Sequence, residues 1–460
     1  MIKIVYLVLL VEYTNAQNPK INCYFNHQVN TSVSSGFNAR YNTSFKDTLI
    51  GYINRSKYTL DFCIYDYTYS SSDGFAAIAT AVNNAYARGV IVRWIYDGSS
   101  TNSGLSLLNT NIKTLGSPTT AAYGICHNKF VAIDVNSTNP NDAYVWTGSF
   151  NFSSSQNTTD YNNIIIFQDQ PLAQAFYSQF NQMWGGTGSS PTLSNSKFGP
   201  FKSPSTITSF TVSGTPVQVY FAPKDNVSNN LQSYINSANY EFYFGIYTFT
   251  DNNIATAMKN RILGGVSARG IEDSFSQSYS PYSTLSPVMG ANLKVYTGSG
   301  IYHNKMLMVD ALHPNSDPLV ATGSYNWSSS ANTKNDENIV VVHDSIIANQ
   351  YYQSFCKNFT DLGGTPCAAL SGIEEYDFGQ LNVIAYPTIT SDQINVQLKC
   401  ANTNFKVELY SSLGELLFNE NYSNTNNIKI NVEALPAGCY FLRISNAGEI
   451  TTQKIIKQIF

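Results

Sequence analysis

Two stretches of the chain carry the same spacing of a histidine, a lysine and an aspartate. Both fit His-x-Lys-x-x-x-x-Asp, with His127, Lys129 and Asp134 in the first and His303, Lys305 and Asp310 in the second. A lysine ammonium two residues from an imidazole repels a metal cation, whereas it favours an anionic tetrahedral group. The two motifs therefore predict phosphate chemistry, and we assign no metal ligand and no cofactor.

The spacing also predicts where the side chains point. In an extended strand, residues two apart share a face, so His127 and Lys129 point the same way and Val131 and Ile133 continue that face. Asp134 lies seven positions after His127, an odd number, so it points to the opposite face of the strand. The same holds for Asp310 and His303 in the second motif. We count both aspartates with the catalytic motifs, but we expect them to brace the motif rather than to transfer protons.

A Gly-Ser-x-Asn tract follows each motif. It places Ser149 and Asn151 after the first motif and Ser324 and Asn326 after the second. Small residues allow close approach to a ligand, and side-chain amides donate to phosphate oxygens. We therefore predict that these four residues bind or support a substrate phosphate.

The residues after the second tract add a carboxylate. Glu337 is expected to accept a hydrogen bond from an imidazole N–H and so to fix the tautomer of that ring. For Asn335 and Asp336, a role as ordinary loop residues stays open. When the two tracts are aligned, Asn162 stands where the second copy has Glu337, so the two histidines are expected to differ in basicity, with Asp160 as the candidate to compensate.

The tracts belong to a longer internal repeat. Residues 52–65 match residues 234–247, and the Gly-Ser tracts match at an offset of 175. In the first copy, residues 62–67, 90–96, 129–135 and 162–168 are strand-like, and residues 75–87 form an Ala-rich helix pattern. Strands alternating with amphipathic helices predict an α/β fold in each half.

The composition excludes several classes of protein. Hydrophobic residues make up 43% of the 460 residues, which excludes a disordered chain. Charged residues make up only 12%, with a net charge of -4, and residues 17–370 hold 19 basic and 20 acidic side chains. Nucleic-acid-binding proteins usually carry a basic footprint, so the composition disfavours such a partner without excluding a local basic groove.

The N-terminus and the cysteines indicate export. Lys3 precedes an apolar run over residues 4–11 and small residues end at Ala16, which predicts a signal peptide over 1–16; a buried strand is the alternative. In an exported chain, Cys356 with Cys367 and Cys400 with Cys439 are candidate disulfides. Cys126, next to the first motif, is expected to be a small buried hydrophobe.

The two motifs, each followed by Gly-Ser-x-Asn, resemble the phospholipase D superfamily over residues 20–365. The resemblance implies a pseudo-dimer in which both motifs meet at one site and no metal is needed. It also implies that His127 attacks phosphorus to give a phosphohistidine, while His303 protonates the leaving alcohol and later activates water. Lys129, Lys305, Asn151 and Asn326 then stabilise the charge on the non-bridging oxygens.

The C-terminal residues have a resemblance of their own. From about residue 386, the segments YPTITSDQINV, VELYSSLGELL and LPAGCYFLRIS resemble the C-terminal sorting domain of the type nine secretion pathway. This resemblance implies a small β-sandwich that is read by the outer-membrane secretion machinery of a Gram-negative bacterium, and a protein that is secreted or held on the outer cell surface. An accessory domain that binds carbohydrate or protein is the alternative.

These observations predict a domain order. After the signal peptide we expect two tandem phospholipase D-like α/β/α sandwich domains, over 17–185 and 215–370, joined by a linker over 186–214. A C-terminal β-sandwich follows over 376–460. We expect a monomer with an internal pseudo-dimer.

Three functions are compatible with the motifs. The favoured one is hydrolysis of the distal phosphodiester of a phosphatidylcholine-like glycerophospholipid to phosphatidate and an alcohol. The alternatives are a metal-independent nuclease that uses the same site and a non-catalytic surface-binding protein, although intact His and Lys in both halves disfavour the latter. Five aromatic residues beside the motifs are expected either to contact acyl chains or to pack in the core: Phe150, Phe152, Tyr302, Tyr325 and Trp327.

Overall fold

The structure is a computed structural model. It describes residues 17–369, 383–386, 389–390, 392–398, 404–412, 414–423, 425, 427–446 and 449–457. The chain divides into two compact units, residues 1–367 and 368–460. The predicted signal peptide and Cys400 lie outside the described residues, so the pairing of Cys400 with Cys439 stays a prediction.

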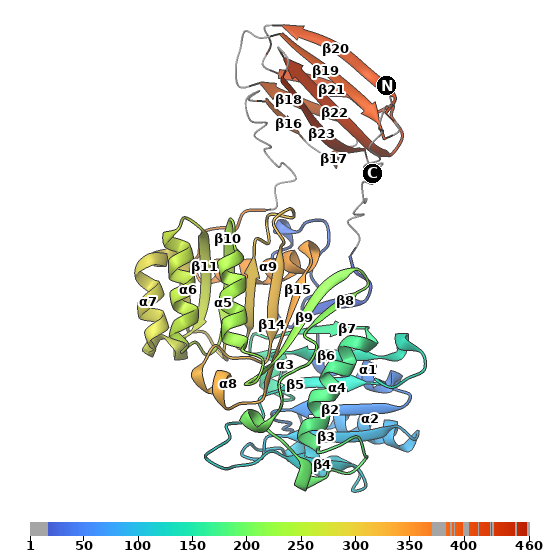
Figure 1. Cartoon of the computed structure of the whole chain (residues 1–460), viewed down its shortest axis with the longest axis vertical. Coiled ribbons are helices and arrows are strands. Elements are labelled where there is room, and N and C mark those ends of the chain that lie inside the picture. The colour runs from blue at the N-terminus through green and yellow to red at the C-terminus, as the bar shows by residue number, and fades with distance from the viewer. Residues whose placement is uncertain are drawn as a thin grey trace, which may run out of the picture. The chain divides into compact units, whose positions relative to one another are not determined.

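The first half of the larger unit is built on a seven-stranded sheet (Figure 1). Its strand order is β1-β7-β6-β5-β2-β3-β4, and β2, β3 and β4 are parallel. The strands are β1 (Ile21–Phe25), β2 (Thr59–Ile64), β3 (Ile91–Tyr96), β4 (Lys113–Gly116), β5 (Lys129–Ile133), β6 (Tyr144–Gly148) and β7 (Asn163–Phe167). The helices are α1 (Phe45–Arg55), α2 (Ala76–Ala87), α3 (Ser154–Thr158) and α4 (Gln170–Trp184).

The second half repeats this sheet, with strands in the order β12-β11-β10-β13-β14-β15-β9-β8. The strands are β8 (Ser209–Val212), β9 (Thr215–Ala222), β10 (Glu241–Ile246), β11 (Ser267–Asp273), β12 (Leu293–Tyr296), β13 (Lys305–Val309), β14 (Leu319–Gly323) and β15 (Glu337–His343). The helices are α5 (Val227–Ser237), α6 (Asn252–Leu263), α7 (Ser280–Met289), α8 (Ser329–Thr333) and α9 (Ser345–Asp361). The order matches the first sheet strand for strand, which confirms the repeat and the α/β fold. Strand β8 is an addition, and it lies within the residues predicted to be a linker.

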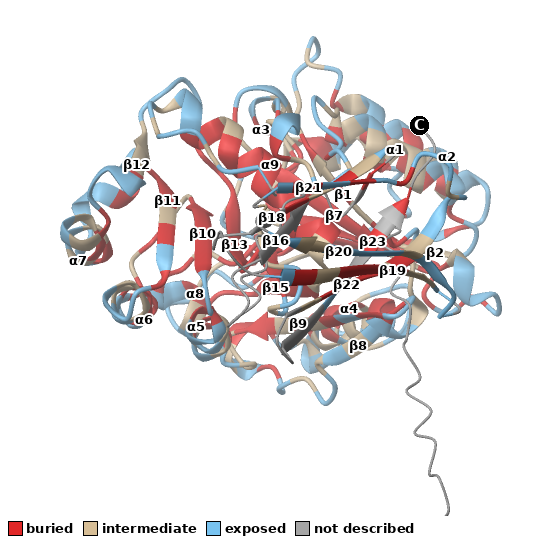
Figure 2. Cartoon of the chain, turned by 90° about the horizontal axis from the view of Figure 1, so that it is seen from above, coloured by how far each residue is buried: buried red, intermediate tan, exposed pale blue. Residues whose placement is uncertain are grey.

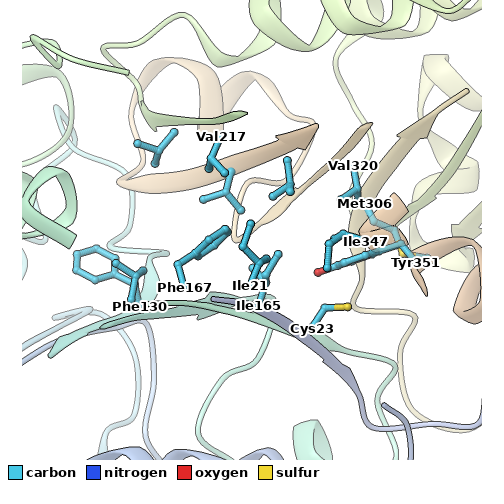
Figure 3. Close-up of a cluster of buried hydrophobic side chains, with 14 of the residues drawn as sticks. Ile21, Cys23, Phe130, Ile165, Phe167, Val217, Met306, Val320, Ile347 and Tyr351 are labelled. Atoms are coloured by element: carbon cyan, nitrogen blue, oxygen red, sulfur yellow. The ribbon is translucent and has the colours of Figure 1, made fainter. Parts of the chain in front are cut away.

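The larger unit contains three hydrophobic cores, and Figure 2 marks the buried residues in red. Helices α1 and α2 pack on the outer face of the first sheet, and α5, α6 and α7 pack on the outer face of the second. The largest core lies between the two sheets and is shared by both halves (Figure 3). Phe176 of α4 and Ile347 of α9 both belong to it, so one helix from each half fills the middle layer. Because this core is continuous, the two halves are held as one body.

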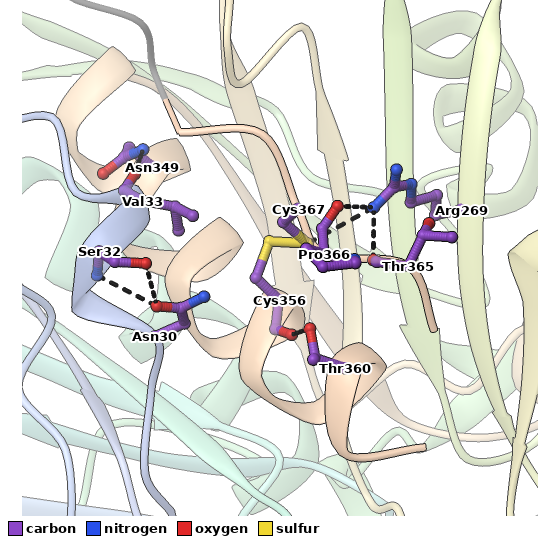
Figure 4. The surroundings of a disulfide bond; sticks show 10 residues. All are labelled: Asn30, Ser32, Val33, Arg269, Asn349, Cys356, Thr360, Thr365, Pro366 and Cys367. Atoms are coloured by element: carbon purple, nitrogen blue, oxygen red, sulfur yellow. Dashed lines mark hydrogen bonds between the residues drawn. A yellow bond between two sulfur atoms is a disulfide. The ribbon is translucent and has the colours of Figure 1, made fainter. Parts of the chain in front are cut away.

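Helix α9 is fixed at both ends. Asp344 accepts hydrogen bonds from the backbone N–H groups of Ile346 and Ile347 at its start. Near its end, Cys356 forms a disulfide with Cys367, as predicted (Figure 4). Beside this disulfide, Arg269 of β11 donates to the carbonyl groups of residues 365 and 366, so the chain after α9 is held against the second sheet.

The glycine of each Gly-Ser tract is required by a close backbone approach. Gly148 has φ +150° and Gly323 has φ +153°. A Cβ at either position would lie 2.3 Å from a carbonyl oxygen, that of Asn163 or Asn338 respectively. Only glycine allows the backbone of each tract to approach the backbone of the neighbouring strand this closely. The close approach fixes the position of the serine that follows.

The smaller unit consists of two antiparallel-rich sheets with one shared core. The first sheet contains β16 (Val383–Tyr386), β18 (Gln393–Leu398) and β21 (Asn427–Asn431). The second contains β17 (Ile389–Thr390), β19 (Asn404–Ser411), β20 (Leu416–Ser423), β22 (Gly438–Asn446) and β23 (Glu449–Lys457). Ile394 and Ile430 of the first sheet pack with Val407 and Leu442 of the second, which confirms the predicted small β-sandwich. In the described parts of the chain, no helix is both long and apolar enough to cross a membrane.

Candidate active site

Both motifs lie at the start of a central strand. Lys129 is the first residue of β5 and Lys305 the first residue of β13, so each histidine lies just before its strand. The residue before each histidine is held by an aspartate, which directly follows β3 in the first half and ends β11 in the second. Asp97 accepts from the backbone N–H of Cys126 at 2.9 Å, and Asp273 accepts from that of Tyr302 at 2.8 Å.

Each histidine ring is held by a residue of the other half. His127 Nδ1 lies 2.7 Å from Oε2 of Glu337, and His303 Nδ1 lies 2.9 Å from Oδ1 of Asn162. The two motifs therefore meet at one site between the halves. Sequence alignment had placed Asn162 and Glu337 at equivalent positions, but it did not reveal that each contacts the histidine of the opposite copy.

The partners fix the tautomer of both rings. A carboxylate only accepts hydrogen bonds, so Nδ1 of His127 donates to Glu337. The side-chain nitrogen of Asn162 donates to the carbonyl of Gln156 at 2.9 Å, so its oxygen faces His303 and accepts from Nδ1. In both neutral rings the lone pair is then on Nε2, the nitrogen available for attack or proton transfer.

The serines of the two tracts support these partners. Ser149 Oγ donates to Asn162 Oδ1 and Ser324 Oγ donates to Glu337 Oε2, both at 2.8 Å. Both serines are fully buried. Their hydroxyl protons are engaged, so both serines support the residues that orient the histidines, and a direct contact with a substrate phosphate stays a prediction.

Asp160 does not take the place of the missing acid. Its carboxylate accepts from Gln156 Nε2 at 2.7 Å and from the backbone N–H of Ile301 at 3.0 Å. It therefore holds the loop before His303, while a neutral amide contacts the ring. The difference between a carboxylate at His127 and an amide at His303 is thus a real asymmetry of the site.

Burial shapes the protonation of all four motif side chains. It lowers the pKa of His127, although the charge of Glu337 acts in the opposite direction. Burial and the neighbouring lysines lower the pKa of His303 well below its ordinary value. Burial lowers the pKa of Lys129 to about 8 and that of Lys305 well below its ordinary value. Without an anion in the site, both imidazoles are therefore neutral near pH 7.

The two lysines are placed alike. Lys129 Nζ donates to the carbonyl of His127 at 2.8 Å, and Lys305 Nζ donates to that of His303 at 2.7 Å. Each ammonium also lies over a tyrosine ring, Tyr65 at 5.1 Å and Tyr247 at 5.2 Å. A lysine has three donors, so each retains donors for an anionic ligand.

Those two tyrosines were not identified as site residues from the sequence. Their rings lie 5.1 Å from the His127 ring and 5.2 Å from the His303 ring respectively. The signal was present in the repeat, because Tyr65 and Tyr247 end the matched segments FCIY and FGIY.

The asparagines of the tracts have unsatisfied side chains. The side-chain oxygens of Asn151 and Asn326 are buried and lack a hydrogen-bond partner among the residues that the structure describes. A buried amide oxygen without a partner is costly, and a bound ligand or water is the usual remedy. The predicted contact with phosphate oxygens would be made by the Nδ2 groups of these two amides, and it stays a prediction.

The two aspartates of the motifs brace the fold. Asp134 accepts from the backbone N–H groups of Lys57, Tyr58 and Thr59, the last of which begins β2. Asp310 makes the equivalent contacts with residues 239–241 before and at the start of β10. Both have a positive φ, +49° and +48°. These contacts tie each motif strand to its neighbour, which is the bracing expected of the two aspartates.

The aromatic residues expected beside the site are core residues. Phe150, Phe152, Tyr302, Tyr325 and Trp327 are at most 1% exposed, so of the two roles expected for them, packing in the core is confirmed and contact with acyl chains is not. A different aromatic row leads outward from His303. Tyr247 stacks on Phe275 at 5.8 Å, and Phe275 lies 5.5 Å from Tyr279; these last two are 48% and 36% exposed.

Within the described ranges, no group of three or more His, Cys, Asp or Glu side chains is arranged to hold a metal ion.

The carboxylate of Glu337 should control the basicity of His127. Because its charge raises the pKa of His127, we expect Glu337→Gln to lower that pKa further. Asn162→Asp is the matched control, since a new charge beside His303 should raise the pKa of His303. The chain has five histidines, so NMR titration of histidine-labelled protein resolves both rings. An unchanged pKa of His127 in Glu337→Gln would contradict the pairing.

Comparison with known proteins agrees with this geometry. The profile of the family described as "Cardiolipin synthase, PLD-like domain" matches residues 49–184 and 231–359. The profile of the "Secretion system C-terminal sorting domain" matches residues 384–458.

Individual relatives match in part. A phospholipase D of Rickettsia prowazekii is 30% identical over 146 residues, which are 31% of this chain and 68% of the relative. A mitochondrial cardiolipin hydrolase of Drosophila melanogaster is 28% identical, over 30% of this chain and 57% of the relative. The structure of a phosphatidylserine synthase of Haemophilus influenzae shares the fold, with a TM-score of 0.51 at 13% identity, over 81% of this chain and 91% of that one.

The profile covers more than half of the chain, and its two matched segments are the two halves that build the site. The chain therefore belongs to the phospholipase D-like family of phosphodiesterases and ends in a secretion sorting domain.

Proposed function

We propose that the protein is an exported phospholipase D that hydrolyses the distal phosphodiester of phosphatidylcholine-like glycerophospholipids to phosphatidate and an alcohol. The observation that carries the proposal is the pair of buried imidazoles, one from each half. Each has its lone pair on Nε2 and a lysine from its own motif beside it. Two neutral rings and two lysines form a site for one phosphodiester, because the charge of the bound anion favours the ammonium form of both lysines.

In the first step, Nε2 of His127 attacks phosphorus and forms an N–P bond. The bond from phosphorus to the leaving alcohol breaks, and His303 donates its Nε2 proton to that oxygen. His303 has to be protonated for this step, and the charge of the bound phosphodiester favours its cation. Lys129 and Lys305, with the amides of Asn151 and Asn326, stabilise the charge on the non-bridging oxygens.

In the second step, the neutral His303 accepts a proton from water as that water attacks phosphorus. The N–P bond breaks, phosphatidate leaves, and His127 returns to its starting state. A single residue thus acts first as acid and then as base.

The unequal partners of the two rings suit these unequal roles. The phosphorylated ring of His127 carries positive charge, which the carboxylate of Glu337 stabilises through Nδ1. Asn162 orients His303 without adding a charge that would retain its proton. This difference supports His127 as nucleophile and His303 as acid and base.

Two observations favour a lipid over a nucleic acid. The catalytic unit lacks an excess of basic residues, with 19 basic and 20 acidic side chains over residues 17–370. Phe275 and Tyr279 are exposed, and Phe275 stacks on Tyr247, the tyrosine beside His303. Exposed aromatic rings of this kind suit contact with a lipid interface. The relatives named as phospholipase D and cardiolipin hydrolase are consistent with a lipid substrate. A nuclease that uses the same site remains the second candidate.

The sorting domain supports export through the outer-membrane secretion machinery of a Gram-negative bacterium. We propose that the protein acts as a monomer, secreted or on the outer cell surface, because one chain supplies both halves of the site.

The proposed site predicts the loss of activity in two single variants. Turnover of phosphatidylcholine should fall at least about 10³-fold in His127→Ala and in His303→Ala, and it should persist in EDTA. Single-stranded DNA serves as the competing substrate. Wild-type turnover in either variant would exclude the site, and turnover of DNA alone would establish the nuclease instead.

The exposed aromatic row predicts a difference between lipid and soluble substrates. We expect Phe275→Ala with Tyr279→Ala to reduce turnover of phosphatidylcholine vesicles about tenfold, because apolar contact with the interface is lost. Turnover of soluble bis(4-nitrophenyl) phosphate should stay unchanged. Tyr58→Ala is the control. It removes a 50% exposed ring just before β2, whereas the site tyrosine Tyr65 follows the other end of that strand. Equal losses on both substrates would show that the row does not serve the interface.

A further inference from the structure

A second carboxylate lies directly beside Glu337 in the chain and is fully buried. Asp336 has no exposed surface, and its carboxylate pairs with Lys202 Nζ at 2.6 Å, with neither side chain exposed. The backbone N–H of Gly199 donates to both of its oxygens at 3.0 Å, and the Tyr123 hydroxyl donates at 2.7 Å. Asp336 directly precedes β15, and all these donors come from segments far from it in the sequence.

These contacts join three segments of the chain next to His127. Lys202 and Gly199 belong to the connection between the halves, and Tyr123 to the segment that leads to the first motif. The backbone of Asp336 accepts from the N–H of His127 at 2.9 Å and donates to the carbonyl of Ile125 at 3.0 Å. The ion pair therefore holds the backbone of His127 and the residue before Glu337 together.

Lys202 also reaches the strand beside Glu337. Its Nζ donates to the carbonyl of Ala222 at 3.1 Å, and Ala222 is the residue opposite Glu337 in the pairing of β9 with β15. One ammonium thus contacts both the chain neighbour and the sheet neighbour of the residue that orients His127.

The equivalent position near His303 is built differently. Tyr161 takes the place of Asp336, and its backbone N–H donates to Ile301 just as that of Asp336 donates to Ile125. Its ring stacks on His27 at 3.8 Å. The equivalent positions thus hold a buried ion pair near His127 and a pair of stacked rings near His303.

We infer that Lys202 is a positioning residue for His127, acting through Asp336 and Glu337. Its ammonium neutralises Asp336, and this allows residues 335–337 to lie buried in the register that brings Glu337 onto Nδ1 of His127. The inference rests on the proposed function, in which His127 is the nucleophile. A small displacement of Glu337 would turn the ring and slow the chemical step.

A second buried ion pair provides a matched control. Arg93 Nε lies 2.6 Å from Asp61 Oδ1, with side chains 3% and 1% exposed. This pair joins β2 and β3 and faces α4, where Arg93 lies over the rings of Phe180 and Trp184. Replacing the cation of either pair leaves a buried aspartate without its partner charge. Only the pair of Lys202 with Asp336 contacts the segments that hold His127.

The test compares Lys202→Met with Arg93→Met in the whole chain, with bis(4-nitrophenyl) phosphate as substrate. Both variants should have a lower Tm. Only Lys202→Met should lower kcat, by about 10²-fold with KM little changed, and shift the NMR signal of the His127 Nδ1 proton. Equal kcat values and an unshifted proton signal in the two variants would overturn the inference.

A charge-balanced double variant covers the case in which Lys202→Met does not fold. Lys202→Met with Asp336→Asn removes both charges, and we expect its kcat to return to within about tenfold of wild type. A double variant that folds but loses kcat about 10²-fold would overturn the inference. Failure of the proposed function is separately visible, because His127→Ala would then retain turnover of the diester.

Discussion

The hydrogen bond between His127 Nδ1 and Glu337 Oε2 is the contact on which the site depends. It fixes the tautomer of the ring and leaves the lone pair on Nε2, and in the proposed mechanism it places a negative charge beside the ring that becomes phosphorylated. The bond joins the two halves, so it forms only if the two sheets are held in a fixed position relative to each other. The shared core around α4 and α9 provides that rigidity, and the ion pair of Lys202 with Asp336 provides it locally.

The two halves share most of the contacts that build the site and differ in the residue that holds each histidine ring. Each retains a lysine bonded to its own histidine's carbonyl, a serine supporting the ring's partner, and a motif aspartate bonded to three backbone N–H groups. They differ in the partner itself, a carboxylate for His127 and an amide for His303. Around the first motif, Cys63 and Cys126 lie 3.6 Å apart, where the second half has Gly245 under the ring of Tyr302.

Much of this arrangement was predictable from the sequence because its signals are local or repeated. Strand parity predicted the bracing role of Asp134, and the repeat predicted two equivalent sheets. What was missed depends on contacts between distant residues. Glu337 was expected to orient a histidine, but its partner lies 210 positions away. Phe150 and Trp327 lie within or directly after the Gly-Ser-x-Asn tracts yet are buried, whereas Phe275, which belongs to neither motif nor tract, reaches the site through Tyr247.

The central claim is that one histidine from each half performs a different part of one reaction, with His127 as the nucleophile. Rapid acid-free quenching during turnover of phosphatidylcholine, followed by peptide mass spectrometry, measures this directly. We expect a phosphatidyl adduct on the peptide that contains His127, and its accumulation when His303 is replaced by alanine and a substrate with a good leaving group is used. An adduct on His303 instead, or turnover without any adduct, would contradict the account.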